Sequence, residues 1–413
     1  MNTMLKLFVH TLLFTPIAST VFAAGSYPIS SCEDLANIAD SDGQYYLVNA
    51  IDCTEMKSFA PIPGTFSGIL NGNHHTISNL TINQGQNGTG LFEQIVGRDE
   101  VYDPATIQNI NFENVLIVGT STFNSNTGLI AGSAHEARIE NINVKNLTIS
   151  GTDQIKGGIL GLASNLTLSN VQLHTTINIA QNQYVGGLIG NSQYNVKIVQ
   201  ASVNPLTVNY AACKYESCAV GGLIGITTSS TQIQLPTTIS RSFAAGRIST
   251  DKNGGGLIGL IDHQSYVNID NSYAIVEIST KKFAGGLIGQ ASEENNRRGN
   301  VVMTHVYTAG KVVGHNKQCD VLPPNGSGHC AKRGVLGNQD KSTPRVKSAG
   351  SFFDKQTSDK EYSGASYTDL NNNQTYEPEA KKTSEMKTAQ TFKAAGWDES
   401  IWKLEDGFYP VLK

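Results

Sequence analysis

Charged side chains are scarce in this chain, and a basic surplus is lacking. Asp, Glu, Lys and Arg make up 15% of the 413 residues, and 34 acidic against 30 basic residues leave a formal net charge of −4. A helical bundle needs many charges on its solvent faces, so this composition argues against one. A nucleic-acid partner would require a basic face, and we therefore expect no such partner.

Long apolar runs are lacking after the first two dozen residues. Lys6 precedes an apolar stretch at 7–22, and the small residue Ala23 stands at its end. A positive start, a short apolar stretch and a small-residue cleavage site are typical of a secretory signal. We assign residues 1–23 to a signal peptide, begin the mature chain near Ala24 and expect no membrane span. The predicted location is secreted, extracellular or periplasmic.

Cysteine is infrequent but patterned. The six cysteines form three local pairs: Cys32 with Cys53, Cys213 with Cys218, and Cys319 with Cys330. Many connectivities are open to six cysteines, but we favour disulfides between these neighbours, because distant coils of an elongated repeat protein stay apart. Disulfides are typical of exported proteins. Metal binding is the alternative, although zinc sites cluster Cys and His more tightly than this.

A five-residue string, Gly-Gly-Leu-Ile-Gly, recurs through the middle of the chain. It stands at 186–190, 221–225, 255–259 and 285–289, with near-copies at 128–132, 157–161 and 334–337. A strip of alternating apolar and polar residues precedes each copy, as in Ile139-Glu-Asn-Ile-Asn-Val144. Such alternation is strand periodicity, and repeats of this length build solenoids.

A unit of two or three short strands cannot bury its apolar face alone. Stacked coils solve this, because their strands pair into parallel sheets around one continuous core. The sequence therefore predicts an all-β fold, a right-handed parallel β-helix (β-solenoid) with small helical N- and C-terminal caps. The hand follows from the general preference of parallel crossovers. The predicted regions are an N-terminal cap at 24–65, the repeats at 66–350 and a C-terminal cap at 351–413.

Glycine and asparagine in the repeat have structural explanations. Glycines beside the Leu-Ile pair permit either a positive φ or a close backbone approach at a corner. Asparagine tolerates left-handed backbone at turns, and in stacked coils it can form a ladder with the asparagines above and below.

The two ends need covers, because an open solenoid end exposes unpaired strand edges. Residues 31–39 read as a short helix with Ser30 or Ser31 as its N-cap, and 383–396 read as a second helix. Trp397 and Trp402, the only tryptophans, and Phe408 then follow. We expect these three aromatic residues to plug the last coil.

The repeated string and its copies resemble the GLUG repeat of bacterial surface and secreted proteins. That repeat also occurs beside the protease domain of IgA-specific metallopeptidases. The segment 66–82 is similar to the first full coil of the family, and 386–410 is similar to its last segment, so the likeness spans about residues 30–413. The resemblance implies a β-helix. It implies no protease activity, since the chain carries the repeat without the protease part.

No group of residues in the sequence strongly indicates a metal site, a catalytic site or a calcium loop. Adjacent residues on a strand point to opposite faces, so His74 and His75 do not share a metal. Asp262-His263 resembles a base with its orienting group but lacks a Ser or Cys partner at a diagnostic spacing. Residues 369–375 match a calcium loop only in part, and a polar turn explains them equally well.

Carboxylates are depleted in the strands. β-Helix enzymes that cleave polysaccharides need carboxylates clustered on one face, whereas Glu140 and Asp270 fall several coils apart. We therefore predict no catalytic residue, no metal site and no cofactor. A carbohydrate-active enzyme (a polysaccharide lyase or a glycoside hydrolase) and a structural spacer of an extracellular matrix remain as alternatives.

Two insertions interrupt the repeat, at 213–218 and 319–330. Both leave from the same corner of the coil, so we expect both to project on one side, each closed by its own disulfide. Insertions on one face of a solenoid are often its binding side, although protection of long loops from proteolysis explains the disulfides equally well. The candidate binding residues are Lys214, Tyr215, Glu216, His315, Lys317, Asp320, His329, Lys332 and Arg333. The leading hypothesis is a non-enzymatic binding or adhesion protein that contacts a host or envelope component, either a glycan or a protein.

Overall fold

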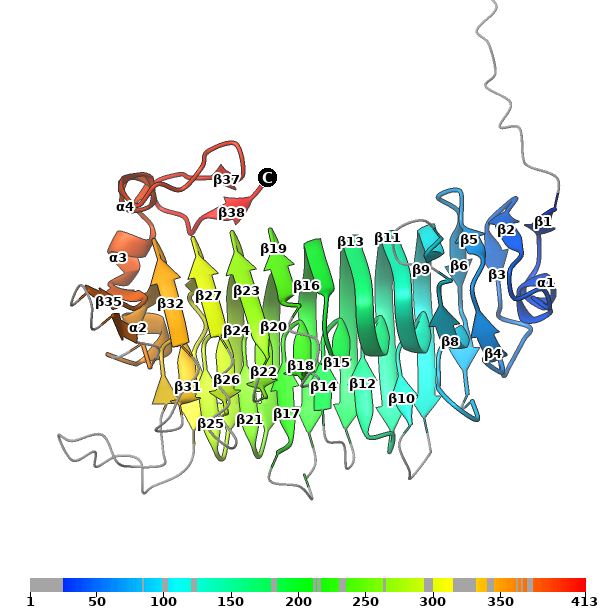
Figure 1. Ribbon diagram of the computed structural model, residues 1–413, viewed down its shortest axis with the longest axis horizontal. Helices are drawn as coiled ribbons and strands as arrows, with labels where there is room; N and C mark the ends of the chain where they lie inside the picture. The colour runs from blue at the N-terminus through cyan, green and yellow to red at the C-terminus, as the bar shows by residue number, and fades with distance from the viewer. Residues whose placement is uncertain are drawn as a thin grey trace, which may run out of the picture.

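The computed structural model consists of parallel strands stacked along one long axis (Figure 1). It describes residues 25–83, 85–98, 103–119, 125–179, 184–210, 213, 217–229, 235–262, 265–292, 300–314, 332–339, 345–361, 363–364, 367–369 and 374–413. The predicted signal peptide lies outside these ranges. Strands of successive coils pair in parallel and in register, which confirms the β-solenoid.

The larger sheet wraps around the body. Its N-terminal strands are β1 (Ser26–Ile29), β2 (Gln44–Leu47), β3 (Ile51–Asp52), β4 (Ile62–Phe66), β5 (Ile69–Asn71), β6 (Thr76–Ser78), β7 (Thr81–Ile82) and β8 (Phe92–Val96). Four long strands bend around the corners of the middle coils: β9 (Ala105–Gly119), β11 (Ala131–Gly151), β13 (Leu160–Ile179) and β16 (Val196–Tyr210). Later coils divide the same path among β19 (Thr237–Ser240), β20 (Phe243–Thr250), β23 (Tyr266–Asp270), β24 (Tyr273–Thr280), β27 (Asn300–Thr304), β28 (Tyr307–Thr308), β29 (Val312–Gly314), β32 (Arg345–Ala349), β33 (Phe352–Asp354) and β36 (Glu379–Lys381).

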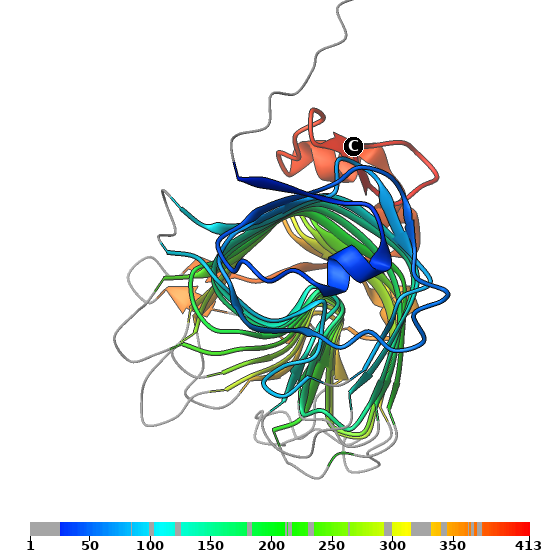
Figure 2. The same ribbon diagram turned by 90° about the vertical axis from the view of Figure 1, so that its right-hand side faces the viewer.

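A second, seven-stranded sheet forms one edge of the body (Figure 1). Its strands are β10 (Asn126–Thr127), β12 (Ile155–Gly157), β14 (Tyr184–Gly186), β17 (Ala219–Gly221), β21 (Asn253–Gly255), β25 (Phe283–Gly285) and β30 (Lys332–Arg333). The chain then turns sharply and rejoins the larger sheet, through β15 (Ile189–Ser192), β18 (Ile224–Thr227), β22 (Ile258–Ile261), β26 (Ile288–Ala291) and β31 (Leu336–Gln339) in the later coils. Viewed along the long axis, the coils fold inward at this turn (Figure 2).

The Gly-Gly-Leu-Ile-Gly string makes that inward turn. Its first glycine ends a strand of the small sheet, as Gly221 ends β17, and its isoleucine begins the next strand, as Ile224 begins β18. No glycine of the four exact copies has a positive φ. A Cβ on Gly222 would instead overlap the carbonyl oxygen of Gly256 in the next coil. Of the two explanations that the sequence allows, close backbone approach is therefore the correct one.

Asparagine forms the predicted ladder. Asn109, Asn141 and Asn170 occupy one corner of successive coils with φ of 58°, 56° and 51°. The Nδ2 of Asn141 donates to Asn109 Oδ1, and the Nδ2 of Asn170 donates to Asn141 Oδ1, both at 2.8 Å. The same corner keeps a positive φ where the residue is Arg241 or His305, at 48° and 52°. The turn is thus set by the coil, and asparagine adds hydrogen bonds to it.

The inward column beside this corner consists of aliphatic residues in register. It comprises Ile107, Ile139, Leu168, Ile198, Ile239 and Ile269, all 0–1% exposed. Burial of each such side chain contributes roughly 1.5–3 kcal/mol. Since every coil adds equivalent residues, the core is continuous along the axis.

The N-terminal cap follows the prediction closely. Helix α1 (Cys32–Ala36) has Ser31 as its N-cap, and its Oγ accepts from the backbone N–H of Asp34 at 3.0 Å. The Asp34 carboxylate accepts in return from the Ser31 backbone at 3.1 Å, which completes a capping box. The disulfide between Cys32 and Cys53 is present, with a Cα–Cα distance of 5.3 Å. The helix ends three residues earlier than predicted.

The C-terminal segment differs from the prediction. The expected helix at 383–396 is divided into α3 (Thr383–Met386) and α4 (Ala389–Ala394). Trp397 and Trp402 are buried, but they pack on the outside of the coils, in a cluster separate from the solenoid core. Phe408 is 67% exposed and plugs nothing. The chain folds back along the wall (Figure 1), and α2 (Lys355–Ser358) lies at the end of the stack instead.

Candidate functional site

Both cysteine-bearing insertions enter the small sheet at one corner, which we call the insertion corner. The first lies between Tyr210, the end of β16, and Ala219, the start of β17; the second lies between Gly314 and Lys332. Because β17 and β30 belong to the same sheet, both insertions rejoin the coil at the same corner, as predicted. Residues 214–216 and 315–331 lie outside the described ranges. Three coil steps separate these strands, which corresponds to about 14 Å at the usual strand spacing.

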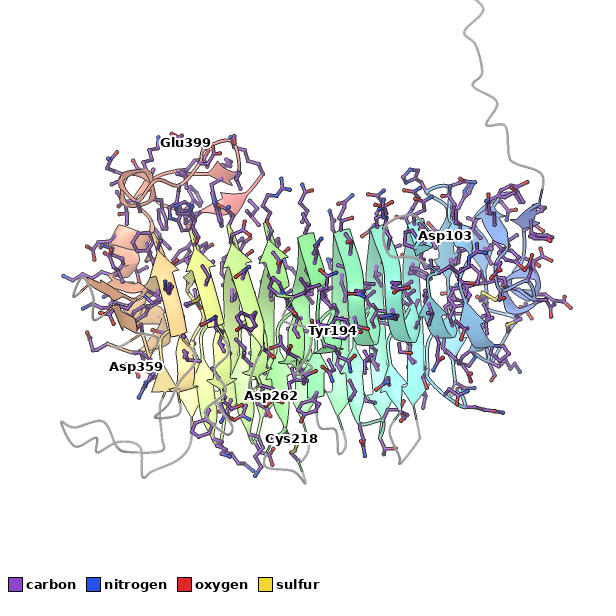
Figure 3. The ribbon with its side chains drawn as sticks, in the orientation of Figure 1. Asp103, Tyr194, Cys218, Asp262, Asp359 and Glu399 are labelled. Carbon is purple, nitrogen blue, oxygen red and sulfur yellow. A yellow bond between two sulfur atoms is a disulfide. The ribbon has the colours of Figure 1, made fainter. Side chains whose placement is uncertain are left out.

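Neighbouring coils hold the base of the first insertion. The predicted disulfide between Cys213 and Cys218 is present, and Cys218 is fully buried at the edge of the small sheet (Figure 3). Its carbonyl accepts from Asn253 Nδ2 of the following coil at 2.9 Å. The hydroxyl of Tyr184 in the preceding coil donates to Ser217 Oγ at 3.3 Å. The insertion therefore starts from a fixed platform.

Most of the candidate binding residues fall outside the described ranges. These are Lys214, Tyr215, Glu216, His315, Lys317, Asp320 and His329, together with the Cys319–Cys330 pair. Lys332 lies in β30, where its backbone pairs with Ala284. Arg333 is half-buried, and its Nη1 donates to the carbonyl of Gly364 at 3.4 Å. Burial also lowers the pKa of the Arg333 guanidinium. Part of this side chain is therefore packed inside the protein.

A small apolar cluster lines the inward turn, and sequence reasoning missed it. Ala219, Ile226 and Leu260 are at most 4% exposed, and Tyr184 packs against them. In adjacent coils the position of Ile226 and Leu260 is held by Asn191 and Gln290. The sequence did contain a signal for this cluster, because Ile226 and Leu260 place apolar side chains at the same position of two consecutive coils. The cluster lies beside the disulfide, since Ala219 directly follows Cys218.

The carboxylates do not converge. Glu140 is in register with Ser169 and Val199, and the same outer column continues through Ser240 to Asp270. Four coil steps, or about 19 Å, separate the two acids, as the sequence predicts. Glycosidase carboxylates lie roughly 5–10 Å apart. Within the described ranges, no group of three or more His, Cys, Asp or Glu is placed to hold a metal.

The weaker candidates have structural explanations where they are described. The N–H of His74 donates to the Asn109 carbonyl at 2.8 Å, and its φ is 64°, so it forms part of a turn. Of residues 369–375, the described ones belong to β34 (Tyr367–Asp369) and β35 (Gln374–Tyr376), which pair antiparallel. Asp262 accepts from Ser292 at 3.3 Å. His263 lies outside the described residues.

Two buried residues of opposite charge inside the coil went unpredicted. Lys156 in β12 and Asp153 just before this strand are both fully buried. Ser125 Oγ donates to the Asp153 carboxylate at 2.7 Å, Thr127 Oγ1 donates to it as well, and Lys156 Nζ donates to the Ser150 carbonyl at 3.0 Å. Burial lowers the pKa of Lys156 to about 8, although the Asp153 carboxylate opposes the shift.

This lysine makes stability depend on pH. Between pH 8 and about 10.4, the ordinary lysine pKa, the folded state has released the Lys156 proton and the unfolded state still holds it. The unfolded state binds more protons there, so the free energy of unfolding rises with pH, by at most about 3 kcal/mol. Above pH 10 a contribution of the opposite sign enters, and it lowers the free energy of unfolding as pH rises. Burial raises the pKa of Tyr307, so the folded state keeps a proton that the unfolded state has lost.

Lys156→Met isolates this contribution. Urea unfolding followed by circular dichroism from pH 7 to pH 10 should show a rise for the natural chain and a flatter profile for the variant. Equal profiles would show that Lys156 is solvated in the folded state.

No protein-family model matches the chain. An alignment of 128 positions with halomucin from Haloquadratum walsbyi shows 34% identity and covers 27% of this chain and 1% of that protein. Among solved structures, a candidate immunoglobulin A1 protease from Bacteroides ovatus superposes over 94% of this chain and 92% of its own, with 16% identity and a TM-score of 0.48. An IgA1 protease superposes over 93% of this chain and 25% of its own, with 18% identity and a TM-score of 0.47.

No helix among the described residues is both long and apolar enough to span a bilayer.

Proposed function

We propose that this protein is exported and acts as a non-enzymatic binding protein, which recognises a glycan or protein on a host surface or cell envelope. The recognition elements are the two insertions at the insertion corner. The observation that carries the proposal is the anchored disulfide of Cys213 and Cys218, with hydrogen bonds to its surroundings from the coils on both sides.

Anchoring favours binding for an entropic reason. A loop that is closed at its base loses less conformational freedom when a partner orders it, so more of its contact energy appears as affinity. Loops on a rigid scaffold are the usual place for recognition. The second insertion rejoins the same small sheet three coils away, at β30, and in this proposal it extends the surface that one ligand can contact.

Two further observations support the proposal. Disulfides persist in oxidising compartments, which agrees with export. Glu140 and Asp270 lie too far apart to cooperate in hydrolysis. This separation favours binding over catalysis on the outer face that carries these two acids.

The test is an array of glycans and extracellular-matrix proteins, probed with the mature chain from Ala24. One variant replaces 213–218 and 319–330 by short Asn-Gly turns. A control variant shortens 229–235, which connects β18 to β19 at a different corner. We expect the first variant to lose at least about tenfold in affinity, the equivalent of one charge-assisted hydrogen bond, and the control to bind normally.

Circular dichroism must be unchanged in both variants for the comparison to hold. Equal binding by all three proteins would contradict the role of the insertions. Absence of binding by the natural chain, together with cleavage of any polysaccharide on the array, would replace the proposal by an enzymatic one.

A further inference from the structure

Threonine and basic side chains alternate along the outer face, at the opposite end of β16 from the disulfide. Thr106, Arg138, Thr167, Lys197 and Thr238 are paired in register across five successive coils. Arg138 and Lys197 are exposed and the three threonines are half-buried. We call this line of five residues the threonine–cation track. The alternation is visible only when the coils are aligned by their hydrogen bonds.

A surface hollow of about 140 Å³ lies on the middle of the track. Its lining includes Pro104, Arg138, Asn165, Thr167, Asn195 and Lys197. Asn195 Nδ2 donates to Asn165 Oδ1 at 3.2 Å, which uses one of the two acceptor positions of that oxygen. The Nδ2 group of Asn165 donates to no described residue, which leaves amide N–H groups beside the two cations. The hollow therefore presents two cationic side chains and the Asn165 amide as hydrogen-bond donors.

The lining of the hollow carries charge of one sign, although Asp103, Glu136 and Glu140 stand within two positions of its residues in the sequence. Its lining contains two cations and no carboxylate. Neither Arg138 nor Lys197 forms an ion pair with a described residue. The nearby Glu136 carboxylate lies 3.4 Å from His135 Nε2. In a chain of net charge −4, this local concentration of positive charge attracts anions, and the arginine fork matches carboxylate or sulfate geometry.

The spacing of the cations indicates the class of ligand. Adjacent coils lie about 4.8 Å apart, so Arg138 and Lys197, two steps apart, are separated by about 10 Å along the axis. A linear ligand with anionic groups at that interval and hydroxyl groups between them would match the track. Each strand of a nucleic-acid duplex carries a charge about every 3.4 Å along the axis, so two cations about 10 Å apart would leave most of its phosphates unmatched.

We propose that the threonine–cation track binds an acidic polysaccharide that runs parallel to the solenoid axis. Its carboxylate or sulfate groups contact Arg138 and Lys197, and its hydroxyl groups bond to Thr167 and the Asn165 amide. Threonine hydroxyls both donate and accept hydrogen bonds, which suits sugar hydroxyls. The track is a site separate from the insertion corner, since the two lie at opposite ends of β16.

The test is calorimetric titration with hyaluronan oligosaccharides, which carry one carboxylate per disaccharide. Dextran serves as the neutral comparison and single-stranded DNA as the comparison of another class. The variant is R138Q/K197Q, and the matched control is K145Q/K311Q, which removes the same charge from exposed positions off the track. We expect the first variant to lose at least about tenfold in affinity and the control to change by less than about twofold.

A second variant, Thr167→Glu, places a carboxylate between the cations and should abolish binding more completely than Thr167→Ala. Higher salt should weaken binding by the natural chain, since screening acts on exposed charges. Equal losses in both double variants, equal binding of dextran, tighter binding of DNA, or no binding of hyaluronan by the natural chain would each overturn the proposal. The insertion variant should keep hyaluronan binding, so this site and the insertion corner can fail independently.

Discussion

Trp402→Ala should lower the free energy of unfolding of the C-terminal segment by about 3–5 kcal/mol, the range for removal of a fully buried large aromatic side chain. Trp402 is 0% exposed and its indole Nε1 donates to Asn271 Oδ1 at 3.0 Å. Its ring lies 4.4 Å from that of Trp397 and 6.2 Å from that of Tyr307. The substitution removes these contacts together and leaves a cavity against the coil wall.

Fluorescence can separate this local loss from unfolding of the solenoid. Both tryptophans of the chain lie in the C-terminal segment, so Trp397 reports on that segment in the variant while circular dichroism reports on the strands. Urea titration should move the fluorescence transition to lower concentration than the dichroism transition. Phe408→Ala is the matched control, because Phe408 is 67% exposed. A single shared transition would mean that the segment and the solenoid unfold as one unit.

The packing of the C-terminal segment against the coil wall could not be predicted from the sequence. Tyr273, Tyr307 and Phe352 stand at outward positions of their strands, in register across three coils. Each alone reads as an ordinary exposed aromatic residue of a strand. Only the register shows that they form one apolar column, and that column is what Trp397 and Trp402 cover. The sequence could therefore predict buried tryptophans but not the surface that buries them.

Features that depend on nearby residues were predicted from the sequence more successfully than features that depend on long-range packing. Ser31 capped its helix as predicted, because the capping signal depends only on residues a few positions away. Nearest-neighbour pairing of Cys32 with Cys53 also held. Lys156 escaped notice since a lysine in a polar turn normally faces solvent, and nothing local indicates that Asp153 accompanies it into the interior. The alternation of Arg138 with Thr167 required the register as well.

The second substitution with a large expected effect on stability is at Gly222, in the inward turn. Gly222→Ala should destabilise the solenoid by about 3 kcal/mol or more, because overpacking against immobile groups costs about 1–3 kcal/mol and displaced hydrogen bonds add to it. The new Cβ would overlap the Gly256 carbonyl. The neighbouring Leu223 N–H donates to the Leu257 carbonyl of that coil at 2.8 Å, and this bond would stretch as the coils separate.

Gly64→Ala distinguishes steric overlap from backbone conformation. Gly64 has a φ of 80° with no atom within 4 Å of an added Cβ, so its substitution costs only the left-handed strain, about 1–2 kcal/mol. Urea unfolding followed by circular dichroism should rank Gly222→Ala well above Gly64→Ala. Equal costs would show that the coils can move apart freely. Because Gly187 faces the Gly222 carbonyl just as Gly222 faces that of Gly256, the string recurs along the chain for a steric reason: each coil must leave room for the carbonyl of the next.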